Sequence, residues 1–289
     1  MIRTPARRVL SATLAVIGMG IFLREAPGKN LPVPITLAAA AQARGGTIKG
    51  RVRLTGKSPG NAVIRMGVDP MCGKMNAGKQ VVNEQVVVSA DGGLANAFVR
   101  LQGSFPRTTA PTQPVTIDQR ACFYLPRVVG TQVGQTLQVR NSDPMLHNVH
   151  SLSTGTNGFN VGQPSAGMVY TVQLKQEEIM LRLKCDVHRW MTAYIGVVSH
   201  PYFAVSGTGG TFEIANVPVG TYTIQTWHER FGSLTRPVRV TAGATTIVDV
   251  PYTGEEKPPP TADARELIVP RSAVSSQLSA ISQLSGDNQ

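Results

Sequence analysis

Apolar and polar residues alternate along the middle of the chain, and this alternation predicts β-strands. Leu181 and Leu183 alternate with the charged Arg182 and Lys184, which is the period-two pattern of a strand with one buried face. The next inward-facing position on this strand is Cys185. We therefore expect a thiol at the end of the strand that points toward the protein core.

Other short apolar or alternating runs are bounded by turn residues such as glycine, proline and asparagine. These runs are residues 47–54, 85–89, 95–101, 193–198, 211–214, 218–224, 236–240 and 245–250. The chain has 289 residues, including 29 glycines and 20 prolines, and only 16% of its residues are charged. This composition fits a β-rich protein that is long enough for two small domains. The predicted fold class is all-β, with two β-sandwiches.

A thiol, an imidazole and a thioether follow one another at intervals of three residues, in Cys185, His188 and Met191. The next strand begins at about residue 193, so the three side chains share one short loop between two strands. A thiolate and a thioether are soft enough to hold Cu(I), and imidazole suits both oxidation states of copper. The loop therefore carries the ligand types of a redox-active copper site.

Two upstream histidines, His147 and His150, are candidates for a second imidazole ligand. Successive side chains of a strand point to opposite faces, so His147 shares a face with Val149 and His150 points the other way. Only one of the two histidines can then reach the same metal ion. One thiolate, two imidazoles and a distant thioether are typical of a blue-copper, or type 1, centre. In the alternative interpretation, the thiol and thioether are core residues and both histidines are ordinary strand residues.

The spacing Cys-x2-His-x2-Met and the upstream His-Asn-Val-His resemble amicyanin, a short-loop member of the cupredoxin family. Residues 122–141 also resemble the cupredoxin strand pair that leads to the first histidine ligand. The resemblance covers residues 116–200 and implies a Greek-key β-sandwich that holds one type 1 copper ion. The metal ligands that it implies are His147, Cys185, His188 and Met191.

The same resemblance implies roles for the residues beside these ligands. Asn148 would hold the cysteine loop from outside the ligand set, and His188, as the outer ligand, would be the electron port. Two positions depart from amicyanin, because Arg189 stands where amicyanin has proline and Trp190 where it has phenylalanine. Together, His188, Arg189 and Trp190 form the expected surface for docking a redox partner.

Residues 201–252 resemble a carboxypeptidase-regulatory-like β-sandwich, through a glycine-rich turn before Phe212 and the segment 216–222. This pattern is common and says little about function. Residues 46–54 resemble the first strand of the same module. In one arrangement, residues 44–115 supply early strands of this sandwich and the copper domain is inserted between them and residue 201. In the other arrangement, three units follow one another along the chain.

The two ends of the chain differ in character from the middle. Residues 1–43 contain an arginine-rich start, an apolar run over residues 9–23 and an Ala-Gln-Ala sequence at their end, which indicates an export signal. The alternatives are a cleaved signal, twin-arginine export and an uncleaved membrane tether. The apolar run is short for the membrane span that a tether would need. For residues 253–289 we expect a proline-rich linker followed by a mostly disordered tail, with a weak amphipathic helix near the end of the tail as the alternative.

The net charge of +11 overstates the charge of the exported part. Residues 1–44 contain six basic residues and one acidic residue, which leaves 22 basic and 16 acidic residues, a net charge of +6. This charge is compatible with acidic redox partners or with association at an anionic membrane surface. The basic residues are scattered without a recognised motif, so nucleic acid is not an expected partner.

Two further cysteines, Cys72 and Cys122, lie outside the ligand loop. An oxidising compartment permits a disulfide between them, and two separate buried thiols are the alternative. The ligand loop contains one cysteine rather than two, which disfavours a dinuclear copper centre.

The expected function is one-electron transfer by a copper protein of the periplasm or cell envelope, between donor and acceptor proteins that the sequence does not name. The alternative is copper delivery, or a structural scaffold of the cell envelope without redox turnover. We do not expect an enzyme, because the sequence shows neither a nucleophile paired with a base nor a His-x-His series for a copper cluster.

Overall fold

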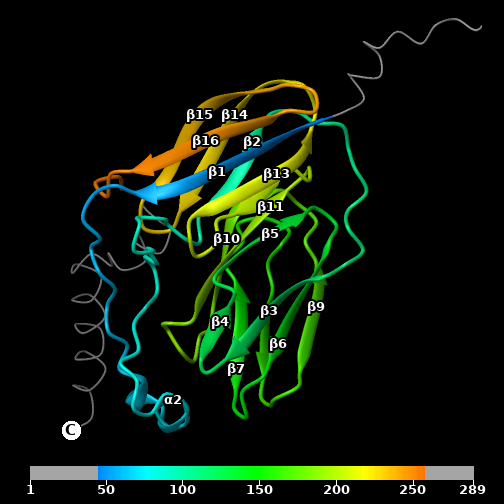
Figure 1. The fold of residues 1–289 in the computed structure, drawn as a ribbon. Helices are drawn as coiled ribbons and strands as arrows, with labels where there is room; N and C mark the ends of the chain where they lie inside the picture. Colours follow the sequence, from blue (N-terminus) through cyan, green and yellow to red (C-terminus); the bar gives the residue numbers. More distant parts are fainter. Residues whose placement is uncertain (1–44, 258–289) are drawn as a thin grey trace, which may run out of the picture. The chain divides into compact units, whose positions relative to one another are not determined.

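The computed structural model describes residues 45–257, which form an almost entirely β structure (Figure 1). The all-β class expected from the sequence is confirmed. The strands form four sheets, and two large apolar clusters mark two separate cores. The expected export signal and nearly all of the tail lie outside the described residues. Within residues 45–257, none of the helices has the length and apolar character needed to cross a membrane.

One sandwich combines strands from the beginning and the end of the described chain. Its strands are β1 (Gly46–Leu54), β2 (Phe98–Gln102), β12 (Phe203–Val205), β13 (Thr211–Val217), β14 (Gly220–His228), β15 (Gly232–Val240) and β16 (Thr245–Tyr252). Their sheet orders are β13-β1-β16 and β12-β2-β14-β15. Figure 1 shows blue β1 beside orange β16, and the two strands are parallel. The amino-terminal segment thus supplies two strands to the sandwich completed after residue 201, the first of the two arrangements considered from the sequence.

The other sandwich is built from the middle of the chain. Its strands are β3 (Val115–Arg120), β4 (Phe123–Leu125), β5 (Val128–Gln132), β6 (Thr136–Asn141), β7 (His147–Ser151), β8 (Asn160–Gln163), β9 (Val169–Gln173), β10 (Glu178–Lys184) and β11 (Thr192–Val198). The sheet orders are β5-β11-β10-β7-β8 and β4-β3-β6-β9. The predicted alternation is present in β10, where Leu181 and Leu183 are buried and their neighbours are not. The side chains of Cys185 and Met191 belong to this core.

A small apolar cluster joins the two sandwiches around Phe98 of β2. The Phe98 ring packs so closely on β11 that a Cβ atom added at Gly196 would lie 2.2 Å from it. Only glycine leaves room for this approach. The contact thereby holds β11, the strand that follows the ligand loop, against the neighbouring sandwich.

The connection between β1 and β2 departs from the predicted pattern. The apolar run at residues 85–89 does not form a strand and makes only an isolated bridge between Val88 and Leu94. Three hydrogen bonds between Ser89 and Gly93 close a tight turn here, so the run folds back on its own sequence instead of joining a sheet. The prediction of a strand was therefore wrong.

The same connection contains a short helical segment, with η1 (Met66–Val68) followed by α2 (Pro70–Met75). We refer to residues 65–76 as the cap segment. Cys72 in α2 forms a disulfide with Cys122, which follows β3. The disulfide that the sequence left open is therefore present in the structure, and it joins the cap segment to the middle sandwich.

Candidate metal centre

The free thiol of Cys185 lies at the end of β10 with 1% of the residue exposed. Two backbone N–H groups, those of Asn148 and His188, each donate to its Sγ atom at 3.4 Å. Burial alone would raise the pKa of the thiol, but hydrogen bonds from His147 and from these backbone groups lower it below its ordinary value. The environment therefore favours the thiolate, the form that binds metals.

Two imidazoles meet beside this sulfur atom. Nδ1 of His147 lies 3.1 Å from Nδ1 of His188, and Sγ of Cys185 lies 3.7 Å from Nδ1 of His188. One ligand atom from each of the three residues lies within 4.8 Å of the others. Both histidines are buried, at 0% and 1% exposure. Three side chains that the sequence predicted as ligands therefore converge on one buried point.

The strand pattern explains why His147 and not His150 reaches this point. In β7, alternate residues beginning with His147 are buried, and the residues between them are partly exposed. His150 points the other way, and its Nδ1 lies 3.0 Å from the Asp186 carboxylate at the surface. One of the two histidines is thus directed away from the cluster, as the alternation predicts.

The remaining predicted ligand, Met191, is fully buried in the same loop. Its N–H donates to the His188 carbonyl at 2.9 Å, and its own carbonyl accepts from the Cys185 N–H at 3.2 Å. These bonds hold the loop in a compact turn that contains all three of its candidate ligands. The role of Met191 as axial ligand stays a prediction.

A carboxylate that the sequence analysis did not identify holds the far side of His147. Oδ2 of Asp143 lies 2.8 Å from Nε2 of His147. Burial alone would raise the pKa of Asp143, but the hydrogen bond with His147 and bonds from the N–H groups of Cys122 and Ala121 keep it below its ordinary value. Burial likewise opposes the charged form of His147, but Asp143 and Cys185 together raise the pKa of His147 to about 9.

A second missed carboxylate, that of Asp69, contacts the other imidazole. Oδ2 of Asp69 lies 3.2 Å from Nε2 of His188. Burial lowers the pKa of His188 below its ordinary value, and the hydrogen bond with Asp69 opposes this change. Each histidine therefore turns Nδ1 toward the thiol and Nε2 toward a carboxylate. Such outer partners orient a histidine ligand and increase its basicity.

The other predicted site residues surround the ligand loop in different ways. The side-chain oxygen of Asn148 accepts from the Asp186 N–H at 3.1 Å, so Asn148 contacts the loop with both its backbone and its side chain. Trp190 is partly buried, with its ring centroid 5.2 Å from that of His188, and Arg189 is exposed. The burial of His188 leaves Arg189 as the most accessible member of the expected docking surface. The electron-port and docking roles stay predictions.

The donor set fits copper better than it fits a hard cation. A buried thiolate and two imidazoles with ordered outer hydrogen bonds are soft and borderline ligands, whereas magnesium and calcium require oxygen atoms. When bound, copper would supply a one-electron couple between Cu(II) and Cu(I). The protein residues would hold the ligand atoms, exclude water and keep the outer nitrogen of each imidazole hydrogen-bonded.

Comparisons with known proteins return structural resemblances only. No protein-family model and no curated protein matches the sequence. A copper-containing nitrite reductase from Thermus scotoductus aligns with 18% identity and a TM-score of 0.29, over 34% of this chain and 25% of that chain. An oxidised amicyanin variant aligns with 20% identity and a TM-score of 0.26, over 29% and 81% of the two chains.

A purple cupredoxin from Nitrosopumilus maritimus aligns with 22% identity and a TM-score of 0.26, over 28% of this chain and 97% of that chain. For the nitrite reductase, by contrast, the aligned part of this chain spans only a quarter of that protein's length. Similarity at these TM-scores carries no argument about function. The case for a metal centre therefore rests on the residues themselves.

Proposed function

We propose that the protein is a type 1 copper protein that carries single electrons outside the cytoplasm. The observation that supports this most directly is the meeting of the Cys185 thiol with the Nδ1 atoms of His147 and His188 at one buried point. Met191 completes the proposed set as a weak axial ligand. A set of one thiolate, two imidazoles and a distant thioether is suited to electron transfer rather than to substrate turnover.

The surroundings of the ligands support rapid cycling between two oxidation states. Nε2 of each histidine is hydrogen-bonded to a carboxylate, and the Cys185 sulfur accepts two backbone hydrogen bonds. These contacts fix the ligand atoms before metal binds, so little rearrangement accompanies the gain or loss of an electron. We propose one copper ion, no catalytic role, and separate donor and acceptor proteins as partners.

An exported location is part of the proposal. It draws support from the arginine-rich and apolar pattern of residues 1–43 and from the Cys72–Cys122 disulfide, because disulfides persist in oxidising compartments. Residue His188 is the proposed electron port, with Arg189 and Trp190 beside it.

The alternative function is copper delivery or a structural role without redox turnover. The burial of all three clustered ligand residues favours this alternative, because exchange of electrons with a partner is faster when a ligand reaches the surface. A reversible redox couple with fast self-exchange would support the carrier. Transfer of copper to an acceptor protein or chelator, without reversible redox cycling, would support delivery.

The test is the visible and electron-paramagnetic-resonance spectrum of the exported portion with one equivalent of Cu(II). We expect an intense blue thiolate-to-copper band and a narrow hyperfine splitting. Replacement of the sulfur in Cys185→Ser should remove the band, and Asp249→Asn, an exposed substitution on β16, serves as the matched control. A pale, ordinary tetragonal spectrum from the unmodified protein would overturn the proposal.

A further inference from the structure

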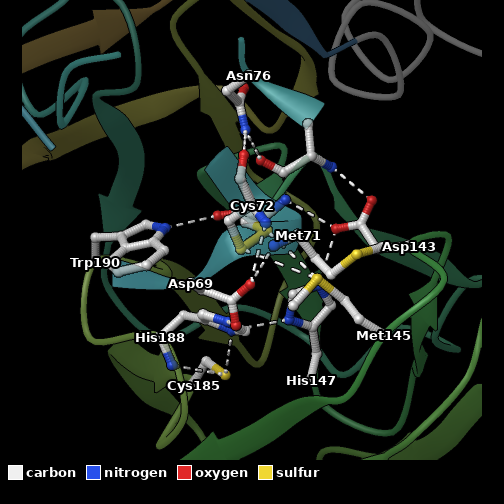
Figure 2. The surroundings of a disulfide bond; sticks show 12 residues. Asp69, Met71, Cys72, Asn76, Asp143, Met145, His147, Cys185, His188 and Trp190 are labelled. Carbon is white, nitrogen blue, oxygen red and sulfur yellow. Dashed lines mark hydrogen bonds and ion pairs between the residues drawn. A yellow bond between two sulfur atoms is a disulfide. The ribbon is translucent and has the colours of Figure 1, made fainter. Parts of the chain in front are cut away.

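The cap segment, residues 65–76, contacts the candidate metal centre although it ends 39 positions before β3 begins at Val115. Figure 2 shows its helix, with Asp69, Cys72 and Asn76, against the imidazoles and the ligand loop. Cys72 is fully buried and belongs to the same apolar cluster as Cys185 and Met191. The segment is therefore part of the core around the site rather than a loop on its surface.

Three kinds of bond attach the cap segment to the middle sandwich. Cys72 forms the disulfide with Cys122. The side-chain amide of Asn76 donates to the Ala121 carbonyl at 3.1 Å and to the Cys72 carbonyl at 2.9 Å. Asp69 contacts His188. All three attachments lie within the segment's eight residues from Asp69 to Asn76, so displacing the cap requires them to break together.

Asp69 joins the fold of the cap to the position of His188. Its Oδ1 atom accepts hydrogen bonds from the N–H groups of Met71 and Cys72, at 2.9 and 3.1 Å, and so caps the amino terminus of α2. Its Oδ2 atom lies 3.2 Å from Nε2 of His188. The imidazole edge directed away from the thiol is thus occupied by the cap, which leaves His188 only 1% exposed.

The ligand loop and the cap meet at a common residue. The indole N–H of Trp190 donates to the Cys122 carbonyl at 2.9 Å, and the sulfur atom of Cys122 is bonded to the cap. The N–H of Cys122 also donates to Asp143, which contacts His147. Movement of Cys122 would therefore disturb the surroundings of both imidazoles.

We propose that residues 65–76 form a disulfide-anchored cap that closes the metal centre, and that Asp69 is a positioning residue for His188. The closed cap restricts access of reagents and metal ions to Cys185 and slows release of a bound ion. The identity of the metal rests on the proposed function, but the closure of the site does not. The cap can therefore be tested on the metal-free protein.

The experiment measures the rate at which N-ethylmaleimide alkylates Cys185 in the metal-free chain, followed by mass spectrometry. Cys185 is the one free thiol, so its modification reports opening of the site directly. Removing the anchor in Cys72→Ser/Cys122→Ser should accelerate alkylation on the order of tenfold or more, because a disulfide limits local opening. The control Asp249→Asn should leave the rate unchanged.

A second comparison keeps the disulfide intact, so it applies even where the double variant fails to fold. Asp69→Ala removes both the helix cap and the contact with His188, and we expect faster alkylation of Cys185. Asp69→Asn retains an acceptor oxygen and a good helix-capping residue, so its rate should return toward that of the unmodified chain. The proton resonance of His188 Nε2 should shift in Asp69→Ala and recover in Asp69→Asn.

Equal alkylation rates in the unmodified chain and Asp69→Ala would overturn the proposal, as would an unchanged rate in a folded Cys72→Ser/Cys122→Ser variant. Circular dichroism establishes that each variant is folded. The alkylation experiment uses the metal-free chain. Faster alkylation in the variants together with a pale copper spectrum would therefore reject only the blue-copper function. Conversely, a blue spectrum with equal alkylation rates would reject only the cap. In the copper-loaded chain, faster loss of copper to a chelator in Asp69→Ala provides a further check.

Discussion

The Asp143 carboxylate contacts Nε2 of His147 at 2.8 Å and also accepts the N–H groups of Ala121 and Cys122, at 2.7 and 2.8 Å. Ala121 and Cys122 have positive φ angles of 52° and 64°, a backbone conformation uncommon for residues with a side chain. Asp143 thus stabilises this turn and orients the imidazole with one side chain. A single carboxylate connects the disulfide-bearing turn to the candidate ligand.

The charge of Asp143 should lower the reduction potential of the bound copper, because a nearby negative charge favours Cu(II) over Cu(I). We expect Asp143→Asn, which keeps an acceptor oxygen, to raise the potential. A unit charge several ångströms away contributes about 2 kcal/mol at an effective dielectric constant of roughly 20, or on the order of 100 mV for one electron. Spectroelectrochemical titration measures the shift, with Asp249→Asn as the control. Identical potentials in the two variants would refute a role for this charge.

The thioether of Met191 should tune the site rather than create it. We expect Met191→Gln to retain a thiolate-to-copper band and to lower the reduction potential, because a harder amide oxygen favours Cu(II). The visible spectrum and a redox titration check these two results separately. An unchanged potential would show that residue 191 does not act on the metal.

The two histidines of β7 provide a matched pair for testing the ligand assignment. His147→Ala should abolish the blue band, whereas His150→Ala should leave it nearly unchanged, because the His150 side chain contacts Asp186 at the surface. Copper titration followed by visible spectroscopy compares the two directly. If His150→Ala bleached the site and His147→Ala did not, the ligand assignment would be reversed.

The buried His228 should make stability depend on pH. Its side chain is fully buried, and burial, together with the nearby Arg127 charge, lowers the pKa of His228 to about 4 from an ordinary 6.5. Between these pH values the unfolded chain binds a proton that the folded chain does not, so stability falls as the pH decreases through this window. The loss amounts to about 3 kcal/mol in full.

Denaturant unfolding at pH 7 and at about pH 4.5 measures this loss. We expect His228→Asn to lose less stability on acidification than the unmodified chain, because its amide does not take up a proton. The asparagine oxygen can still accept the Arg230 N–H that Nδ1 of His228 accepts. Equal losses in the two proteins would assign the pH dependence to other groups.

Local patterns were enough to predict much of the fold and of the ligand set. The alternation of Leu181 and Leu183 predicted the buried face of β10, and the same period placed His147 and His150 on opposite faces of β7. Both predictions succeed because the side-chain direction in a strand depends on the pleat, which has a period of two residues. The strand expected at residues 85–89 failed because an apolar run alone does not specify a pairing partner.

The sequence by itself determined which side chains near the site can bind a soft metal, how they are spaced, and which of them face inward, since these follow from residue chemistry and strand geometry. Only the tertiary structure decided that Asp143 and Asp69 each reach an imidazole, and that Cys72 pairs with Cys122. It also placed the cap over His188 and β1 beside β16. Such contacts join segments far apart in the chain, so they depend on sheet register and on the packing of both sandwiches rather than on any local pattern.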